Sequence, residues 1–247
     1  MTNEFETTFE ALVAGWNATA DANRASVGQG WEVAEVFARL HFRALKAISR
    51  SAGAHPDDTH TAGLLAGTHS LNLLLGIVDL VMRGQHDVAG HLLRGVMDAQ
   101  SLLFAVLADP TDASEYLGRG IKASDARMKI VQTLRGAGAH AEADDVNDRF
   151  LTEYGAANTL AHAGAVHAEK VLERSDGSIT PIVGGRADAR ESVLMLAAAL
   201  DQEFWALTWF AQFQRPSLDE YDEPWSDDFE RARTQFAEWR ALPDEVR

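Results

Sequence analysis

Apolar residues recur at three- and four-residue spacing along most of the 247-residue chain. This spacing places them on one face of an α-helix, whereas the two-residue alternation typical of a strand never extends beyond a few residues. The spacing predicts helices over these ranges: 3–20, 31–52, 61–83, 86–108, 112–135, 139–173, 188–214 and 227–240. We therefore expect an all-α protein built as an antiparallel helical bundle.

Two of these helices, over 61–83 and 86–108, are apolar around most of their circumference. A helix with this pattern is buried in a protein core rather than laid on its surface. Arg83-Gly84 separates the two helices, and Asp109-Pro110 ends the second. Because so short a link reverses the chain direction, we expect an antiparallel hairpin at the centre of the bundle.

The segment 176–185 is the longest stretch without helical spacing, and we expect a loop or a short hairpin there. Pro181 has no amide hydrogen to donate and argues against a central strand. The chain shows no repeat of fixed period. We expect a helical-bundle domain over 1–213, followed by a C-terminal arm over 214–247 that is acidic and rich in aromatic residues.

The charge balance limits the partners. The chain carries 22 Lys and Arg against 37 Asp and Glu, a formal net charge of −15. Proteins hold nucleic acids mainly through Lys and Arg contacts to phosphate, so nucleic acid is a disfavoured partner. Much of the acidic excess lies in the C-terminal arm, where residues 219–245 hold ten Asp or Glu and three Arg. The charge argument against nucleic acid is therefore weaker for a pocket that contains Arg94.

The residue inventory also bears on cofactors and location. The chain has no cysteine, which excludes disulfides and Cys-ligated metals and fits a reducing cytoplasm. The Glu-x-x-His pairs of di-iron bundles are missing as well, and we expect no cofactor and no metal. The most apolar stretch, 64–82, is interrupted by His69, Asn72 and Asp79. We expect no membrane span, no signal peptide after the acidic first residues, and a cytoplasmic location.

Polar residues of the helix over 86–108 fall in one narrow stripe, because each residue advances a helix by about 100°. The stripe consists of His91, Arg94, Asp98 and Ser101. Arg94 and Asp98 are four residues apart and can form an ion pair. The stripe is either the solvated side of the helix or an internal polar seam. In a buried seam, Asp98 would be the obligatory partner of Arg94.

A second polar stripe lies on the helix expected over 139–173, which is rich in alanine. Tyr154, Asn158 and His162 stand at intervals of four residues and share one face, which Glu169 continues. A histidine aligned with a tyrosine and an asparagine can act as a general acid or base held by hydrogen bonds. The other reading is a core histidine whose nitrogens are bonded to neighbours. We take these three residues, with Arg94 and Asp98, as candidate catalytic residues.

Half of the chain's aromatic residues gather near the C-terminus. They are Phe204, Trp205, Trp209, Phe210, Phe213, Tyr221, Trp225, Phe229, Phe236 and Trp239. Such rings can fasten a C-terminal arm across the bundle or form an interface between copies of the chain. A lid over a ligand cavity is a third reading. We take Trp205 and Trp209, with His91 and Ser101, as candidate ligand-binding residues.

The run from Gly90 to Pro110, followed by Tyr154-x3-Asn158-x3-His162, resembles bacterial HEPN-like domains of unknown function. The resemblance rests on an Arg-x3-acidic pair, an Asp-Pro helix end and a later Tyr-x3-polar-x3-His, and it covers roughly residues 60–175. It implies an antiparallel helical bundle, often dimeric and often found in toxin–antitoxin or phage-defence systems, with RNA cleavage in the active branches.

The sequence departs from the nuclease branch of that family. Nuclease members carry an Arg-polar-x3-His motif on one helix, and here Ala157 stands where the arginine would precede His162. We therefore expect a HEPN-like binding or sensing component, with a protein partner or a small ligand and a homo-oligomeric, dimeric assembly. Two alternatives stay open: a HEPN-type ribonuclease or RNA-binding protein, and a small-molecule enzyme with a cavity in the bundle.

Overall fold

The computed structural model describes residues 9–162, 172–175, 178–181 and 187–242. These residues form an all-α antiparallel bundle with one small hairpin, as the helical spacing predicts. The elements are α1 Phe9–Val27, α2 Gln29–Ala52, α3 Asp58–Met82, α4 His86–Ala108, α5 Pro110–Gly118, α6 Ala123–Gly136, α7 His140–His162, β1 Leu172–Ser175, β2 Ser178–Pro181, α9 Ala189–Phe213, α10 Arg215–Tyr221 and α11 Trp225–Ala241.

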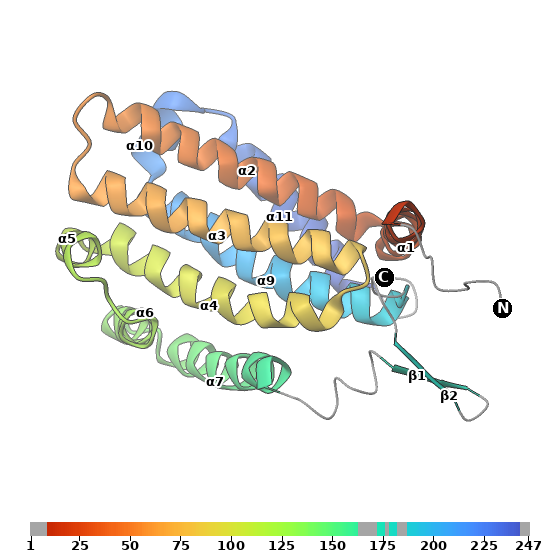
Figure 1. Ribbon diagram of the computed structural model, residues 1–247. Helices are drawn as coiled ribbons and strands as arrows, with labels where there is room; N and C mark the ends of the chain where they lie inside the picture. Colours follow the sequence, from red (N-terminus) through yellow and green to blue (C-terminus); the bar gives the residue numbers. More distant parts are fainter. Residues whose placement is uncertain (1–8, 163–171, 176–177, 182–186, 243–247) are drawn as a thin grey trace.

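Four long helices, α2, α3, α4 and α9, form the centre of the bundle (Figure 1). Each of α2, α3 and α4 contacts α9, and α3 lies between α2 and α4. Other helices cover opposite sides: α6 and α7 lie along the α4 side, α10 and α11 lie along the α2 side, and α5 contacts both α3 and α4. Helix α9 is therefore buried along most of its length, with exposed positions such as Leu194.

The turn between α3 and α4 confirms the central hairpin. Gly84 has a φ of 71°, a conformation that L side chains adopt only at a cost. This conformation lets the amide of Gln85 donate to the carbonyl of Leu80 at 2.8 Å, which closes the end of α3. The two most apolar helices of the chain thus pack side by side, as expected from their composition.

Three predicted helices end differently in the structure. The helix expected over 3–20 continues to Val27 as α1. The helix expected over 112–135 is divided into α5 and α6, because Gly120 takes a φ of 76° after the chain leaves α5. Asp109 starts α5 by accepting a hydrogen bond from the Thr111 amide at 2.8 Å. This bond holds the pKa of the Asp109 carboxyl below its ordinary value. The helix expected over 139–173 is wrong at its C-terminal end, since Leu172 begins β1.

Of the segment 176–185, the structure describes residues 178–181, which form β2 and pair with β1. The two strands are antiparallel, with Leu172 opposite Pro181 and Ser175 opposite Ser178. Pro181 stands at the end of a two-stranded sheet, a position where its missing amide hydrogen costs little.

Among the described residues, α3 and α4 are long and apolar enough to cross a membrane. The polar residues His69, Asn72 and Asp79 do not remove α3 from this class, and all three are exposed on the helix surface. In the bundle, 39% of the most apolar part of α3 and 61% of that of α4 are buried. Core helices of soluble proteins have the same length and composition, so the finding does not decide between the two environments.

The C-terminal arm is held to α2 by large buried rings. Trp225 is fully buried, and its indole nitrogen donates to the carbonyl of Leu40 at 2.8 Å. Trp239 lies against Gly30 of α2, and an added Cβ at Gly30 would stand 2.5 Å from the indole ring. Trp239 therefore packs against α2 at Gly30, where the absence of a side chain leaves room for the indole ring.

Ion pairs add to this attachment. The guanidinium of Arg43 on α2 contacts both carboxylate oxygens of Asp222 at 2.7 Å and reaches Asp228 on α11 at 2.5 Å. The bidentate contact with Arg43 lowers the pKa of the Asp222 carboxyl. Part of the acidic surplus of the arm is thus neutralised by a cation of the bundle.

We predict opposite effects for two Gly→Ala substitutions. Gly30→Ala forces a methyl group into the ring of Trp239 and should lower the free energy of unfolding by about 2 kcal/mol. Gly15→Ala in α1, where nothing lies within 4 Å of the added carbon, should raise it by about 0.5 kcal/mol through helix propensity. Chemical denaturation measures both. Equal effects of the two substitutions would contradict the placement of Trp239.

Candidate functional site

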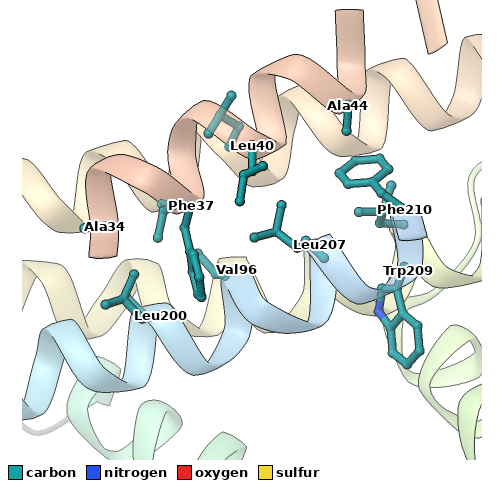
Figure 2. Close-up of a cluster of buried hydrophobic side chains, with 14 of the residues drawn as sticks. Ala34, Phe37, Leu40, Ala44, Val96, Leu200, Leu207, Trp209 and Phe210 are labelled. Atoms are coloured by element: carbon teal, nitrogen blue, oxygen red, sulfur yellow. The ribbon is translucent and has the colours of Figure 1, made fainter. Parts of the chain in front are cut away.

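Two faces of α9 have different neighbours. Leu200, Leu207 and Phe210 point toward α2, where they meet side chains such as Leu40 and Ala44 (Figure 2). Trp209 points away from these residues, on the other side of α9. One face of α9 therefore belongs to the central core, and the other looks toward the cover formed by the α4 side of the bundle.

A narrow pocket lies on that second face. The cavity itself measures about 30 Å³, and together with the recess around it, part of which is open to solvent, the unfilled space is about 520 Å³. Its described lining comes from four helices: Gln100 of α4, Ile130 of α6, Val146 and Phe150 of α7, and Asp201, Gln202, Trp205 and Trp209 of α9. A concave, mainly apolar site with a few polar groups is the usual form of a small-molecule site.

Two tryptophans form the α9 wall of the pocket. The rings of Trp205 and Trp209 are stacked, with centroids 5.2 Å apart and planes inclined by 27°. Trp209 also makes an edge contact with Phe104 of α4 at 4.9 Å, so its ring is fixed on both sides. Phe150 adds a ring from α7. Flat aromatic walls of this kind suit a flat ligand.

Gln100 supplies a polar group without a partner. Its side chain is 2% exposed, and its amide nitrogen donates to the hydroxyl of Ser70 at 2.8 Å. The amide oxygen is buried and accepts no hydrogen bond. An unsatisfied buried acceptor costs about 1–3 kcal/mol, so a donor that reached it would relieve a real penalty.

The remaining polar lining is neutral or paired. Asp201 forms an ion pair with Arg240 of α11 at 3.1 Å. Gln202, like Gln100, is a neutral amide and is buried. Among the described residues that line the pocket, none is Lys, Arg or His. The described lining therefore offers no cation of its own, and the guanidinium of Arg240 beside it is paired with Asp201.

Next to the pocket, Asp98 is paired across two helices. The structure places the guanidinium of Arg127 on α6 at 3.6 Å from its carboxylate, whereas the sequence suggested Arg94 of the same helix. Burial raises the pKa of the Asp98 carboxyl, and the attraction of Arg127 and then of Arg94 offsets part of that rise. Arg127 also lies 5.4 Å from the ring centre of Phe150, a lining residue. The pair joins α4 to the wall of the pocket.

The four residues of the polar stripe of α4 differ in burial. His91 is exposed, Arg94 and Asp98 are half-buried, and Ser101 is fully buried. The Ser101 hydroxyl donates to the Met97 carbonyl of its own helix at 3.0 Å. None of these four residues is among the described lining of the pocket, whereas the predicted ligand residues Trp205 and Trp209 are.

The second stripe cannot be placed in the same detail. The backbone of Tyr154, Asn158 and His162 belongs to α7. Their side chains lie outside the described residues, and so does Glu169. A composite site of Arg94, Asp98 and His162 therefore stays a prediction.

Sequence reasoning missed a buried pair in the centre of the bundle. His41 of α2 and Glu203 of α9 are both fully buried, and the Nδ1 of His41 lies 2.5 Å from a carboxylate oxygen of Glu203. The second nitrogen and the second oxygen of the pair have no hydrogen-bond partner. The His41 ring packs against the edge of Phe210 at 4.9 Å.

A signal for this pair is present in the sequence. His41 stands between Phe37, Leu40, Ala44 and Leu45, at the positions that form the apolar face of α2. Glu203 stands in the same way on the Leu200, Leu207 and Phe210 face of α9. An ionisable residue at a core position needs a partner, but the spacing alone does not say which one.

Comparison with family models, curated proteins and solved structures found no match to this chain. The described residues also contain no group of three or more His, Asp or Glu that could hold a metal ion. The resemblance to HEPN-like domains stays a prediction from the sequence, and the function has to be argued from the site itself.

We predict that Asp98→Asn raises the melting temperature at pH 7 by about 1–2 °C. Burial raises the folded-state pKa of this carboxyl, so the ionised form lowers stability at neutral pH. The gain should disappear as the pH falls through the raised pKa of Asp98, because the wild-type carboxyl is then protonated and neutral. Asp144→Asn, at an exposed carboxylate of α7, removes the same charge and should show no such trend. A loss of stability in Asp98→Asn would contradict this account.

For the buried pair, we predict strong coupling. Each single variant, His41→Leu or Glu203→Leu, leaves one buried polar side chain without its partner. Each should lower the free energy of unfolding by about 3 kcal/mol. The double variant removes both groups and should cost much less than the sum of the two. Denaturation of the four proteins gives the coupling energy. Additive costs would show that the two side chains do not interact.

Proposed function

We propose that the protein is a binding or sensing component that takes a small, mainly apolar ligand into the pocket between α4, α6, α7 and α9. One observation carries the proposal: the pocket is lined by the stacked rings of Trp205 and Trp209 and by Gln100, whose buried amide oxygen accepts no hydrogen bond. A core that had evolved only for stability would gain from filling this space and from pairing this oxygen.

The binding role is the one expected from the sequence, and the pocket is the site that we propose for it. The proposal moves the ligand from the polar stripe of α4 to the aromatic face of α9. The HEPN-like relationship, a dimeric assembly, a bacterial defence context and a cytoplasmic location are further parts of the proposal, and each rests on the sequence alone.

The two alternatives receive less support from the described residues. A ribonuclease needs cations for phosphate, and the described pocket lining contains no Lys or Arg. An enzyme acting on a small molecule needs a reactive group, and among the described lining residues the titratable side chain is Asp201, which Arg240 holds. Binding without chemistry therefore fits the pocket best.

The test uses 1-fluoronaphthalene, a neutral apolar bicyclic probe, observed by fluorine NMR. The wild-type protein should bind it saturably, with line broadening that gives a dissociation constant. Val146→Phe fills the pocket from α7 and should weaken binding at least about tenfold. Val88→Phe makes the same change at an exposed site of α4 and should leave binding unchanged.

The outcome against the proposal is equally clear. If both valine variants bind the probe as the wild type does, or if the wild type shows no saturable binding, the pocket is not a ligand site. Circular dichroism of each variant verifies that the bundle has formed. Trp205→Leu, which removes one indole from the wall, provides a second weakened variant should Val146→Phe prove unstable.

A further inference from the structure

The pocket also carries information on the class of its ligand, and this inference rests on the proposed function. Three properties of the lining bear on it: the shape set by the aromatic rings, the charge of the polar groups, and the direction of the one unsatisfied hydrogen bond. Each restricts the ligand in a different way.

Shape comes first. Trp205 and Trp209 present a stacked pair from α9, and Phe150 contributes a ring from α7. The rings are held in place, since Trp209 contacts Phe104 and Phe150 lies beneath the guanidinium of Arg127. A pocket with three aromatic rings in its lining favours a flat ring system over a branched aliphatic chain.

Charge comes second. The described lining offers two amides, Gln100 and Gln202, and one carboxylate, Asp201, which is paired with Arg240. An anionic ligand would lose its hydration without gaining a cation, and a chain of net charge −15 repels it. A cationic ligand would have to compete with Arg240 for Asp201. A neutral ligand meets neither cost.

The hydrogen bond comes third. One of the two N–H groups of the Gln100 amide donates to the Ser70 hydroxyl at 2.8 Å, and the amide oxygen accepts no hydrogen bond. That oxygen accepts, so its partner must donate. It is buried in the ligand-free protein, and lining side chains must shift slightly for a ligand to reach it. A ligand without a donor would leave the oxygen as unsatisfied as before.

We propose that the ligand is a neutral, flat, aromatic molecule that carries an N–H or O–H group, and that this group donates to the amide oxygen of Gln100 while the ring lies against Trp205. The proposal fixes both the ring and the direction of the hydrogen bond. It excludes anions, branched aliphatic compounds and aromatic compounds that only accept hydrogen bonds.

Three bicyclic probes of nearly equal size separate these requirements. Indole carries an N–H donor, benzothiophene carries no donor, and benzoxazole carries an acceptor nitrogen in place of the donor. Titration calorimetry on the full chain should give a dissociation constant for indole about tenfold lower than for either of the others. Benzothiophene controls for the apolar contact that all three share.

Gln100→Met tests the residue. Methionine keeps the length and apolar body of the side chain and removes the amide, so indole and benzothiophene should bind this variant within about twofold of each other. Gln212→Met makes the same change at an exposed position of α9 and should preserve the wild-type preference for indole. Should Gln100→Met fail to fold, Gln100→Glu provides a second variant that keeps an acceptor oxygen and should still prefer indole to benzothiophene.

The outcomes distinguish this inference from the proposed function. Equal binding of indole and benzothiophene to the wild type, or a preference for benzoxazole, overturns the ligand class while the pocket remains a binding site. Binding of 1-fluoronaphthalene without binding of any of the three probes overturns the ligand class as well. Failure of all four molecules to bind removes the proposed function and this inference together.

Discussion

The burial of Glu203 against His41 determines how α9 sits in the bundle. A carboxylate with no exposed surface is tolerable only where a partner meets it, and the His41 Nδ1 stands 2.5 Å from it. Because a helix advances about 100° per residue, fixing Glu203 toward α2 turns residues 205 and 209 to the opposite half of α9. One buried pair in the core thus sets the direction of both tryptophans of the pocket.

The pocket follows from this rotation and from the cover on the α4 side. Helices α6 and α7 pack on α4 and bring Ile130, Val146 and Phe150 to face the indoles. The Asp98–Arg127 pair ties α4 to α6, and Arg127 extends over Phe150. Helices α10 and α11 complete the core on the α2 side, whereas α6 and α7 leave a pocket with an aromatic lining on the α4 side, and Gln100 is part of that lining. The proposed binding site is therefore a consequence of the bundle's asymmetry.

Much of the fold could be predicted, because helical spacing and turn residues are local. The α3–α4 hairpin follows from two apolar runs and Gly84, whereas the break at Gly120 between α5 and α6 was not predicted, because the apolar spacing continues across it. The pairing of charged groups could not be predicted in the same way. His41 and Glu203 are separated by 162 positions, and Asp98 is paired with Arg127 of the next layer, so both depend on helix packing that no local pattern encodes. Trp205 and Trp209 could be predicted as lining residues because aromatic residues cluster near the C-terminus. Gln100 could not, because an amide in an apolar helix carries no sequence signal of a pocket.

A crystal structure of the protein with indole bound tests most directly whether this pocket is a ligand site. We expect the indole ring in the pocket, against Trp205, with its nitrogen within hydrogen-bond distance of the Gln100 amide oxygen and with the Ser70 contact kept. The His41–Glu203 pair should be unchanged, since the helical spacing places Glu203 on the other face of α9 from Trp205 and Trp209. An empty pocket at saturating indole, or indole bound only on the outer surface of the bundle, would contradict the account.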